Sequence, residues 1–134
     1  MCANGGLMRT RIFVLTMGVA AILLVLRPVS AHHGTAAYDT SKVVTVKGTM
    51  TEFRFINPHV QLYFDVKNGK AETEKWQAEL TAPNKLTRAG WEKNTLKPGD
   101  SITASGYVSK SDSHTMWINK LIGPEGQDLQ LRED

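Results

Sequence analysis

Apolar and polar residues alternate along much of the chain, which is the pattern of half-buried β-strands. The clearest alternation covers residues 60–66, and shorter runs of the same kind cover residues 76–80, 102–108 and 116–122. Residues 43–56 form a longer run that is rich in Val, Thr and Phe. The pattern therefore predicts five strands.

The first and last of these strands carry further detail. Within residues 43–56 the apolar positions change parity near Thr51 and Glu52, which predicts a bulge or bend in a long strand. Alternation also divides the last strand into two faces, with Trp117 and Leu121 on one and Met116, Ile118 and Ile122 on the other.

Turn-forming residues separate the strands. Asn57-Pro58 interrupts the pattern after the first strand, and Asn68-Gly69 predicts a hairpin turn after the second. Residues 83–89 predict a short helix after the third strand, because Pro83 suits a first turn and Gly90 suits a helix end. Residues 129–131 suggest a short terminal strand.

The order of three strands, a short helix and two strands predicts a mainly β fold. In about a hundred residues this order fits a small five-stranded Greek-key barrel of the OB type, with the helix between strands 3 and 4. A long, bent first strand also fits, since it can pair on both sides of a small barrel. A β-sandwich is the alternative fold.

The N-terminal segment has a different composition. Arg9 and Arg11 precede fifteen uncharged, mostly apolar residues, Ile12 to Leu26, and small residues end the segment at Ala31. A basic start, a short apolar run and a small-residue exit predict a secretory signal helix that is removed. An uncleaved anchor is the alternative, although a spanning helix needs about 20 apolar residues. Met8 is an alternative start.

These boundaries predict a signal peptide over 1–31, an N-terminal arm over 32–42 and a barrel domain over 43–134. The whole chain has a formal charge of +3. Residues 32–134, by contrast, carry 13 basic and 13 acidic residues and no Cys. The excess charge therefore belongs to the export signal, and we expect a periplasmic or secreted protein with no stable membrane anchor and no nucleic-acid partner.

Four short motifs occur in order along the chain. They are Ala31-His32-His33-Gly34 at the predicted cleavage site, Asn57-Pro58-His59, Gly90-Trp91, and Leu96-x-Pro98-Gly99-Asp100. Taken together, they resemble a family of small exported bacterial proteins of unknown function. The resemblance covers nearly the whole chain. It implies an exported β-barrel without an established activity.

The sharpest candidate for chemistry is His32. Cleavage after Ala31 would make His32 the first residue, so that its α-amine and its Nδ1 atom could chelate one metal ion. Nitrogen ligands of this kind suit Cu(II) among the divalent first-row ions. One more imidazole would complete a three-nitrogen site, and this arrangement resembles the histidine brace of exported copper proteins.

His59 is the leading candidate for that third nitrogen, because its loop leaves the first strand where the arm could fold back. His33 and His114 are the alternatives. Cleavage one residue earlier would instead make His33 the third-position ligand of an amino-terminal site. The predicted metal ligands are therefore His32, His33 and His59, with copper as the predicted cofactor.

No catalytic signature accompanies these histidines. Residues 32–134 hold no G-x-S-x-G elbow, no Cys nucleophile and no phosphate-binding glycine loop, and alternation places Glu79 on a solvated face. We therefore expect a binding protein and not an enzyme. The alternative function is a metal-free module that binds an envelope protein or a small ligand on its barrel face. Its candidate residues are the strand aromatics Phe53, Phe55, Tyr63, Trp76, Tyr107 and Trp117.

Overall fold

The computed structural model describes residues 35–132, so that the predicted signal peptide, His32 and His33 lie outside the described residues. Across the described range there are five strands, one α-helix and one 3-10 turn. In chain order these are η1 (Thr35–Ala37), β1 (Val44–Arg54), β2 (Gln61–Lys67), β3 (Thr73–Glu79), α2 (Pro83–Arg88), β4 (Ser101–Val108) and β5 (Thr115–Ile122). Within residues 35–132, no helix has the length and apolar character needed to cross a bilayer.

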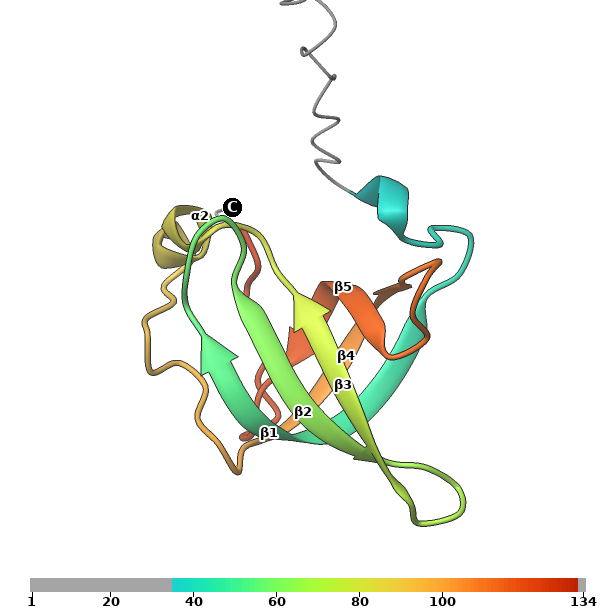
Figure 1. The fold of residues 1–134 in the computed structure, drawn as a ribbon. Helices are drawn as coiled ribbons and strands as arrows, with labels where there is room; N and C mark the ends of the chain where they lie inside the picture. Colours follow the sequence, from blue (N-terminus) through green and yellow to red (C-terminus); the bar gives the residue numbers. More distant parts are fainter. Residues whose placement is uncertain (1–34, 133–134) are drawn as a thin grey trace, which may run out of the picture. The chain divides into compact units, whose positions relative to one another are not determined.

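The five strands close into a barrel in the order β1-β2-β3-β5-β4 (Figure 1). Neighbouring strands are antiparallel except β3 and β5, which pair in parallel over three residue pairs. This topology, with a short helix between β3 and β4, is that of a five-stranded OB-type Greek-key barrel. The predicted fold is therefore confirmed, and the sandwich alternative is wrong because the sheet closes on itself.

The long first strand bends as its sequence predicts. Its N-terminal half pairs with β4 and its C-terminal half pairs with β2, and the register to β2 shifts between Met50 and Glu52. Gly48 lies in the stretch that pairs on both sides. A Cβ atom there would lie 2.6 Å from the ring of Phe64 and 2.8 Å from the carbonyl oxygen of Asp65. Glycine therefore permits the close approach of β1 to β2 at the bend.

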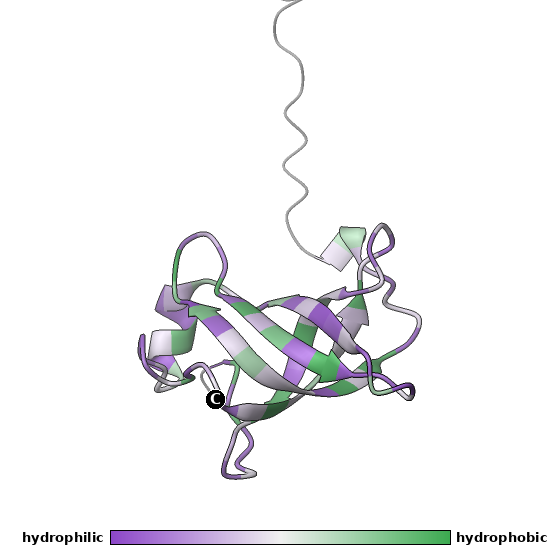
Figure 2. Ribbon diagram, turned by 60° about the horizontal axis from the view of Figure 1, so that its bottom comes forward, coloured by the Kyte–Doolittle hydropathy of each residue, from purple (hydrophilic) through white to green (hydrophobic). Residues whose placement is uncertain are grey.

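Alternate residues of the strands fill the barrel interior. Figure 2 shows the corresponding alternation of hydrophobic and hydrophilic residues along the strands. On β2 the alternation is complete: Leu62 and Phe64 are at most 1% exposed, whereas their neighbours face outward. Helix α2 contributes the buried Leu86, and Trp91 after the helix donates its indole hydrogen to the carbonyl oxygen of Gln130 at 2.6 Å. Sixteen buried residues form this one core.

The last strand departs from simple alternation. Lys120 pairs with Ser105 and Ile118 pairs with Gly106, so Asn119 is an extra residue in β5. Leu121 is therefore buried on the same side as Met116 and Ile118, whereas Ile122 and Trp117 are only partly buried. The predicted two-face division of residues 116–122 is wrong, because one bulged residue reverses the side-chain parity that follows it.

Two connections also differ in detail from expectation. The hairpin between β2 and β3 forms with a loop over residues 68–72, because Asn68 Oδ1 accepts hydrogen bonds from the backbone N–H groups of Lys70 and Glu72.

The suggested terminal strand is wrong for the part of the chain that is described. The backbone N–H of Leu129 donates to the carbonyl oxygen of Leu121, but a single bridge forms there, and Leu129 packs against the core.

Candidate functional site

His59 lies in the loop between β1 and β2, directly after the cis Asn57-Pro58 peptide. The register of β2 and β3 pairs Gln61 with Glu79, which brings His59 to the last residue of β3. As a result, His59 Nδ1 lies 3.3 Å from Glu79 Oε2. The two side chains are 32% and 24% exposed, so this pair is neither fully solvated nor buried.

Two aromatic rings complete the surroundings of His59. Trp117 is the register partner of Glu79 in the parallel pairing of β3 and β5, and its ring meets the His59 ring edge-on with centroids 5.2 Å apart. The ring of Tyr38 lies 6.1 Å from that of Trp117. We refer to His59, Glu79, Tyr38 and Trp117 as the His59 cluster.

Tyr38 belongs to the segment before β1 and is anchored to the barrel. It forms a β-bridge with Ser109, and it is 8% exposed. Burial raises the pKa of Tyr38 to about 12, and the negative charge of Glu79 and a hydrogen bond to its carboxylate act in the same direction. Tyr38 therefore remains a neutral phenol that faces the carboxylate of Glu79 at any physiological pH.

The position of Glu79 has a chemical consequence for His59. A carboxylate beside Nδ1 favours the tautomer with its proton on Nδ1, and the lone pair of a neutral ring is then on Nε2. A carboxylate or carbonyl on the far nitrogen is the usual arrangement of metal-binding histidines. Among residues 35–132, however, no group of three His, Cys, Asp or Glu side chains is placed to hold a metal ion.

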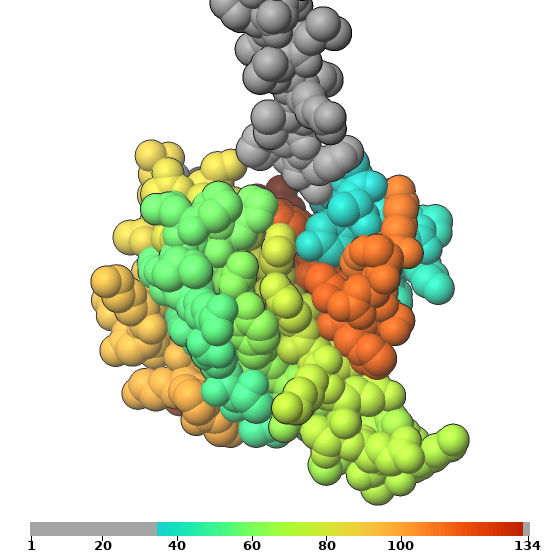
Figure 3. All heavy atoms as spheres, viewed as in Figure 1, coloured from blue at the N-terminus to red at the C-terminus, as the bar shows by residue number. Residues whose placement is uncertain are grey.

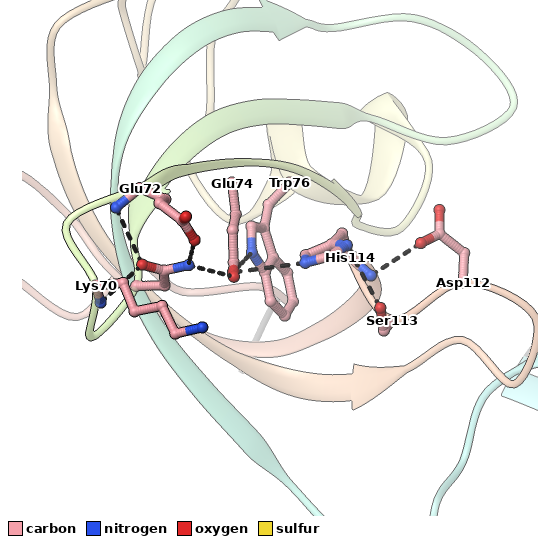
Figure 4. Close-up of polar contacts among 8 residues, drawn as sticks. Lys70, Glu72, Glu74, Trp76, Asp112, Ser113 and His114 are labelled. Carbon is pink, nitrogen blue, oxygen red and sulfur yellow. Dashed lines mark hydrogen bonds and ion pairs between the residues drawn. The ribbon is translucent and has the colours of Figure 1, made fainter.

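His114 belongs to a second cluster, shown in Figure 4. Its Nε2 atom lies 3.5 Å from Glu74 Oε2, and its ring meets Trp76 edge-on with centroids 5.2 Å apart. Glu74 also accepts hydrogen bonds from Asn68 Nδ2 at 3.2 Å and from Trp76 Nε1 at 3.4 Å. These two hydrogen bonds and then the charge of His114 lower the pKa of Glu74. The structure thus gives His114 partners of its own, distinct from those of His59.

The strand aromatics pack in separate groups. Trp76 is buried and stacks on Phe64, whereas Phe53 packs against Trp91 and Tyr63 lies under the guanidinium of Arg54. Only part of the predicted set, Trp117 above all, contributes to the His59 cluster. A ligand-binding barrel face remains a prediction, and these rings pack in separate groups.

Sequence reasoning found His59 but missed Glu79, Tyr38 and Trp117 as its partners. The alternation correctly placed Glu79 outside the core, yet a solvated position alone does not reveal a neighbour from another element. The available signal was topological: in an OB-type barrel β3 and β5 pair in parallel, which brings the outward residues of these two strands together.

These observations define a small OB-type barrel protein with a histidine–carboxylate pair on its surface. The chain belongs to the family of unknown function DUF6152, whose model matches residues 21–117. This agrees with the resemblance carried by the four motifs. No curated protein sequence matches the chain.

Solved structures similar to this chain include two of TiaS. The first, of a ZRD-deleted mutant in complex with agmatine, is 20% identical over 69% of this chain and 24% of that chain, with a TM-score of 0.44. The second, a complex of TiaS with a tRNA and ATP, is 16% identical over 64% and 19%, with a TM-score of 0.41. The structure of yeast Stn1 and Ten1 is 8% identical over 60% and 42%, with a TM-score of 0.39. The chain thus spans less than half the length of each of these proteins.

Proposed function

We propose that this protein is an exported, non-enzymatic barrel protein that binds Cu(II) at its mature N-terminus. In this proposal the α-amine and Nδ1 of His32 supply two nitrogen ligands, and Nε2 of His59 supplies the third. His33 is the neighbouring candidate ligand. The observation that carries the proposal is the carboxylate of Glu79 3.3 Å from Nδ1 of His59, because it leaves Nε2 of a neutral His59 ring as the coordinating atom.

The length of the arm supports the same pairing. Tyr38 packs against Trp117, and the ring of Trp117 contacts His59. A hydrogen bond of 2.9 Å from the N–H of Tyr38 to the carbonyl oxygen of Thr35 keeps the start of the described chain close to Tyr38. Two residues, His33 and Gly34, separate Thr35 from His32, and the three Cα–Cα steps span at most about 11 Å. The arm is therefore short, and it is anchored next to the proposed ligand.

The character of the surroundings also suits a copper ion. Two imidazoles and an amine form a nitrogen-rich set, which favours Cu(II) over Mg(II), Ca(II) or Mn(II) by ligand type and by the affinity order of the divalent ions. The ring of Trp117 covers one side of His59 and is itself packed against Tyr38. These contacts hold the ring of His59 in one orientation before a metal binds.

The test compares the exported protein, its N-terminus verified by mass spectrometry, with a version that carries one added N-terminal residue. We expect Cu(II) binding with a nitrogen-rich electron paramagnetic resonance spectrum, and we expect the added residue to weaken binding by at least tenfold. His59→Ala should change the spectrum, whereas the matched control His114→Ala should not, because His114 is held by Glu74 and Trp76. Identical spectra for all four proteins would overturn the proposal.

The same measurement separates the two possible cleavage positions. A terminus at His32 predicts that His59→Ala alters the copper spectrum. A terminus at Ala31 predicts an amino-terminal site in which His33 is the third-position ligand, so that His33→Ala abolishes binding and His59→Ala has no effect. That second pattern would overturn the assignment of His59.

A further inference from the structure

A pocket of about 390 Å³ lies between helix α2 and the C-terminal segment of the described chain. Helix α2 is on the outside of the barrel, in yellow at the upper left of Figure 3. Three of the five described residues that line the pocket are cations, and none of the five is an acid. They are Thr81, Lys85, Arg88, Leu131 and Arg132, and we refer to this feature as the basic pocket.

The positive charge of the basic pocket is not balanced within residues 35–132. Four ion pairs form in this range, and none of them includes Lys85, Arg88 or Arg132. Lys85 and Arg88 lie one turn apart on the same face of α2, and like charges at that spacing repel each other. Residues 32–134 as a whole carry 13 basic and 13 acidic residues, so the excess of positive charge is local. An anion in the pocket would relieve the repulsion.

Both walls of the basic pocket are attached to the barrel core. In α2, Leu86 is fully buried, which fixes the side of the helix that faces outward. In the C-terminal segment, the carbonyl oxygen of Gln130 accepts the indole hydrogen of Trp91 at 2.6 Å, and Leu131 packs against the core. The backbone that carries the three cations is therefore held in place, so that binding of a ligand needs to order only their side chains.

We propose that the basic pocket binds the phosphoryl group of a small, soluble phosphate monoester. Such a group carries a charge of about −1.5 to −2 at pH 7 and three strong acceptor oxygens. The guanidinium groups of Arg88 and Arg132 suit these oxygens, because a guanidinium donates two parallel hydrogen bonds to a phosphate. Lys85 adds a third charged donor, and the hydroxyl of Thr81 adds a neutral one. A carboxylate, with one charge and two oxygens, would leave more of the positive charge unbalanced.

The size and the rim of the basic pocket favour a soluble ligand over a membrane surface. Its volume falls within the range of about 300–1,000 Å³ that is typical of small-molecule sites, which leaves room for the rest of the monoester. The exposed large hydrophobic residues of the described range, Val43 and Ile56, do not line it, so its rim lacks an apolar side chain that could enter a bilayer. His59 and Glu79 do not line it either, so the proposal does not depend on the copper site.

The test is a titration of the copper-free, 15N-labelled protein with glycerol 3-phosphate at about 0.15 M salt, where exposed charges are screened. We expect saturable shifts of the backbone amides of Lys85, Arg88 and Arg132, and no shift in the β2–β3 loop, residues 68–72. Acetate is the singly charged comparison and should bind about tenfold more weakly. Vesicles of phosphatidylglycerol present a related phosphate on a membrane, and the protein should not sediment with them. Because no copper is present, this experiment can fail or succeed independently of the copper proposal.

Matched variants locate the binding. Lys85→Gln removes one charge from the pocket and should weaken binding by about tenfold, whereas Lys70→Gln makes the same change at an exposed loop position outside the pocket and should leave binding unchanged. Glu133 and Asp134 follow Arg132 in the sequence, so the double variant Glu133→Gln/Asp134→Asn tests whether the chain's own carboxylates occupy the pocket.

Five results would overturn the proposal. They are the absence of shifts at the pocket amides, equal binding of acetate, binding to the vesicles alone, equal binding by the two Lys variants, and binding by the double variant alone.

Discussion

Glu79 and Trp117 are direct register partners in the parallel pairing of β3 and β5 that closes the barrel, and both contact His59. The carboxylate lies beside Nδ1 of the imidazole, and the indole lies against its ring. The orientation of a loop histidine thus depends on the closure of the sheet. In His59 the fold thus places a carboxylate beside Nδ1, and Nε2 is the nitrogen that can bind a metal ion.

Removing the negative charge at Glu79 should weaken the proposed copper site without unfolding the barrel. Glu79→Gln keeps the size of the side chain but no longer favours a proton on Nδ1 of His59. We expect Cu(II) affinity to fall by about 10- to 100-fold, as for other partners of metal-binding histidines. A competition titration with a copper chelator measures this. Glu74→Gln, the equivalent change beside His114, is the control, and equal affinities for the two variants would contradict the expectation.

Stability at alkaline pH should depend on Tyr38. Its folded-state pKa of about 12 lies above the ordinary value of 10.0. The folded state therefore holds this proton more tightly than the unfolded state, and the stabilisation is complete below pH 10 and lost as the pH rises toward 12. Two pKa units correspond to about 2–3 kcal/mol. Urea unfolding at pH 9 and at pH 12 should show a steeper loss for the wild type than for Tyr38→Phe.

Stability at acidic pH should depend on Glu74. Hydrogen bonds from Asn68 and Trp76, and then the charge of His114, lower the pKa of this carboxyl below its ordinary value of 4.5. The stabilisation is therefore present above pH 4.5 and disappears as the pH falls through the folded-state value. The difference in unfolding free energy between wild type and Glu74→Gln should shrink in that range. Glu125→Gln, at an exposed turn, controls for the loss of one charge; the same pH dependence in both variants would contradict the prediction.

Gly106 should not tolerate a side chain. It faces the bulged region of β5, where a Cβ atom would overlap the carbonyl oxygen of Trp117 and lie 2.8 Å from its carbonyl carbon. Gly106→Ala should therefore force β4 away from β5 and cost about 1–3 kcal/mol or more. Chemical denaturation measures the loss. The control is Gly69→Ala, in an exposed loop where a Cβ atom meets nothing within 4 Å, and it should change stability by less than about 0.5 kcal/mol.

The C-terminal segment should depend on one indole hydrogen bond. Trp91 Nε1 donates to the carbonyl oxygen of Gln130, which holds the segment that carries Leu129 and Leu131 against the core. Trp91→Phe removes this donor and also shrinks a side chain that is 3% exposed, so we expect a loss of about 2–4 kcal/mol. Hydrogen exchange should accelerate selectively at the amide of Leu129, which donates to Leu121. Unchanged exchange there would show that the segment is held by packing alone.

Local patterns in the sequence were enough to predict the architecture of the barrel. The alternation of residues 60–66 placed Leu62 and Phe64 inside, and the parity change near Thr51 located the bulge that the register of β1 confirms. Such inferences succeed because side-chain direction along a strand is a local property of the backbone. They failed for β5, where strict alternation was carried through two successive polar residues, Asn119 and Lys120, although the register to β4 makes Asn119 an extra residue.

Which residues meet around His59, by contrast, is decided by the tertiary structure. His59 was identified from its residue type and its turn, but Glu79, Trp117 and Tyr38 lie 20, 58 and 21 positions away from it in the chain. Their meeting depends on the parallel contact of β3 with β5 and on the bridge from Tyr38 to Ser109. Contacts of this kind depend on sheet closure and register, which are properties of all the strands together and of no single segment.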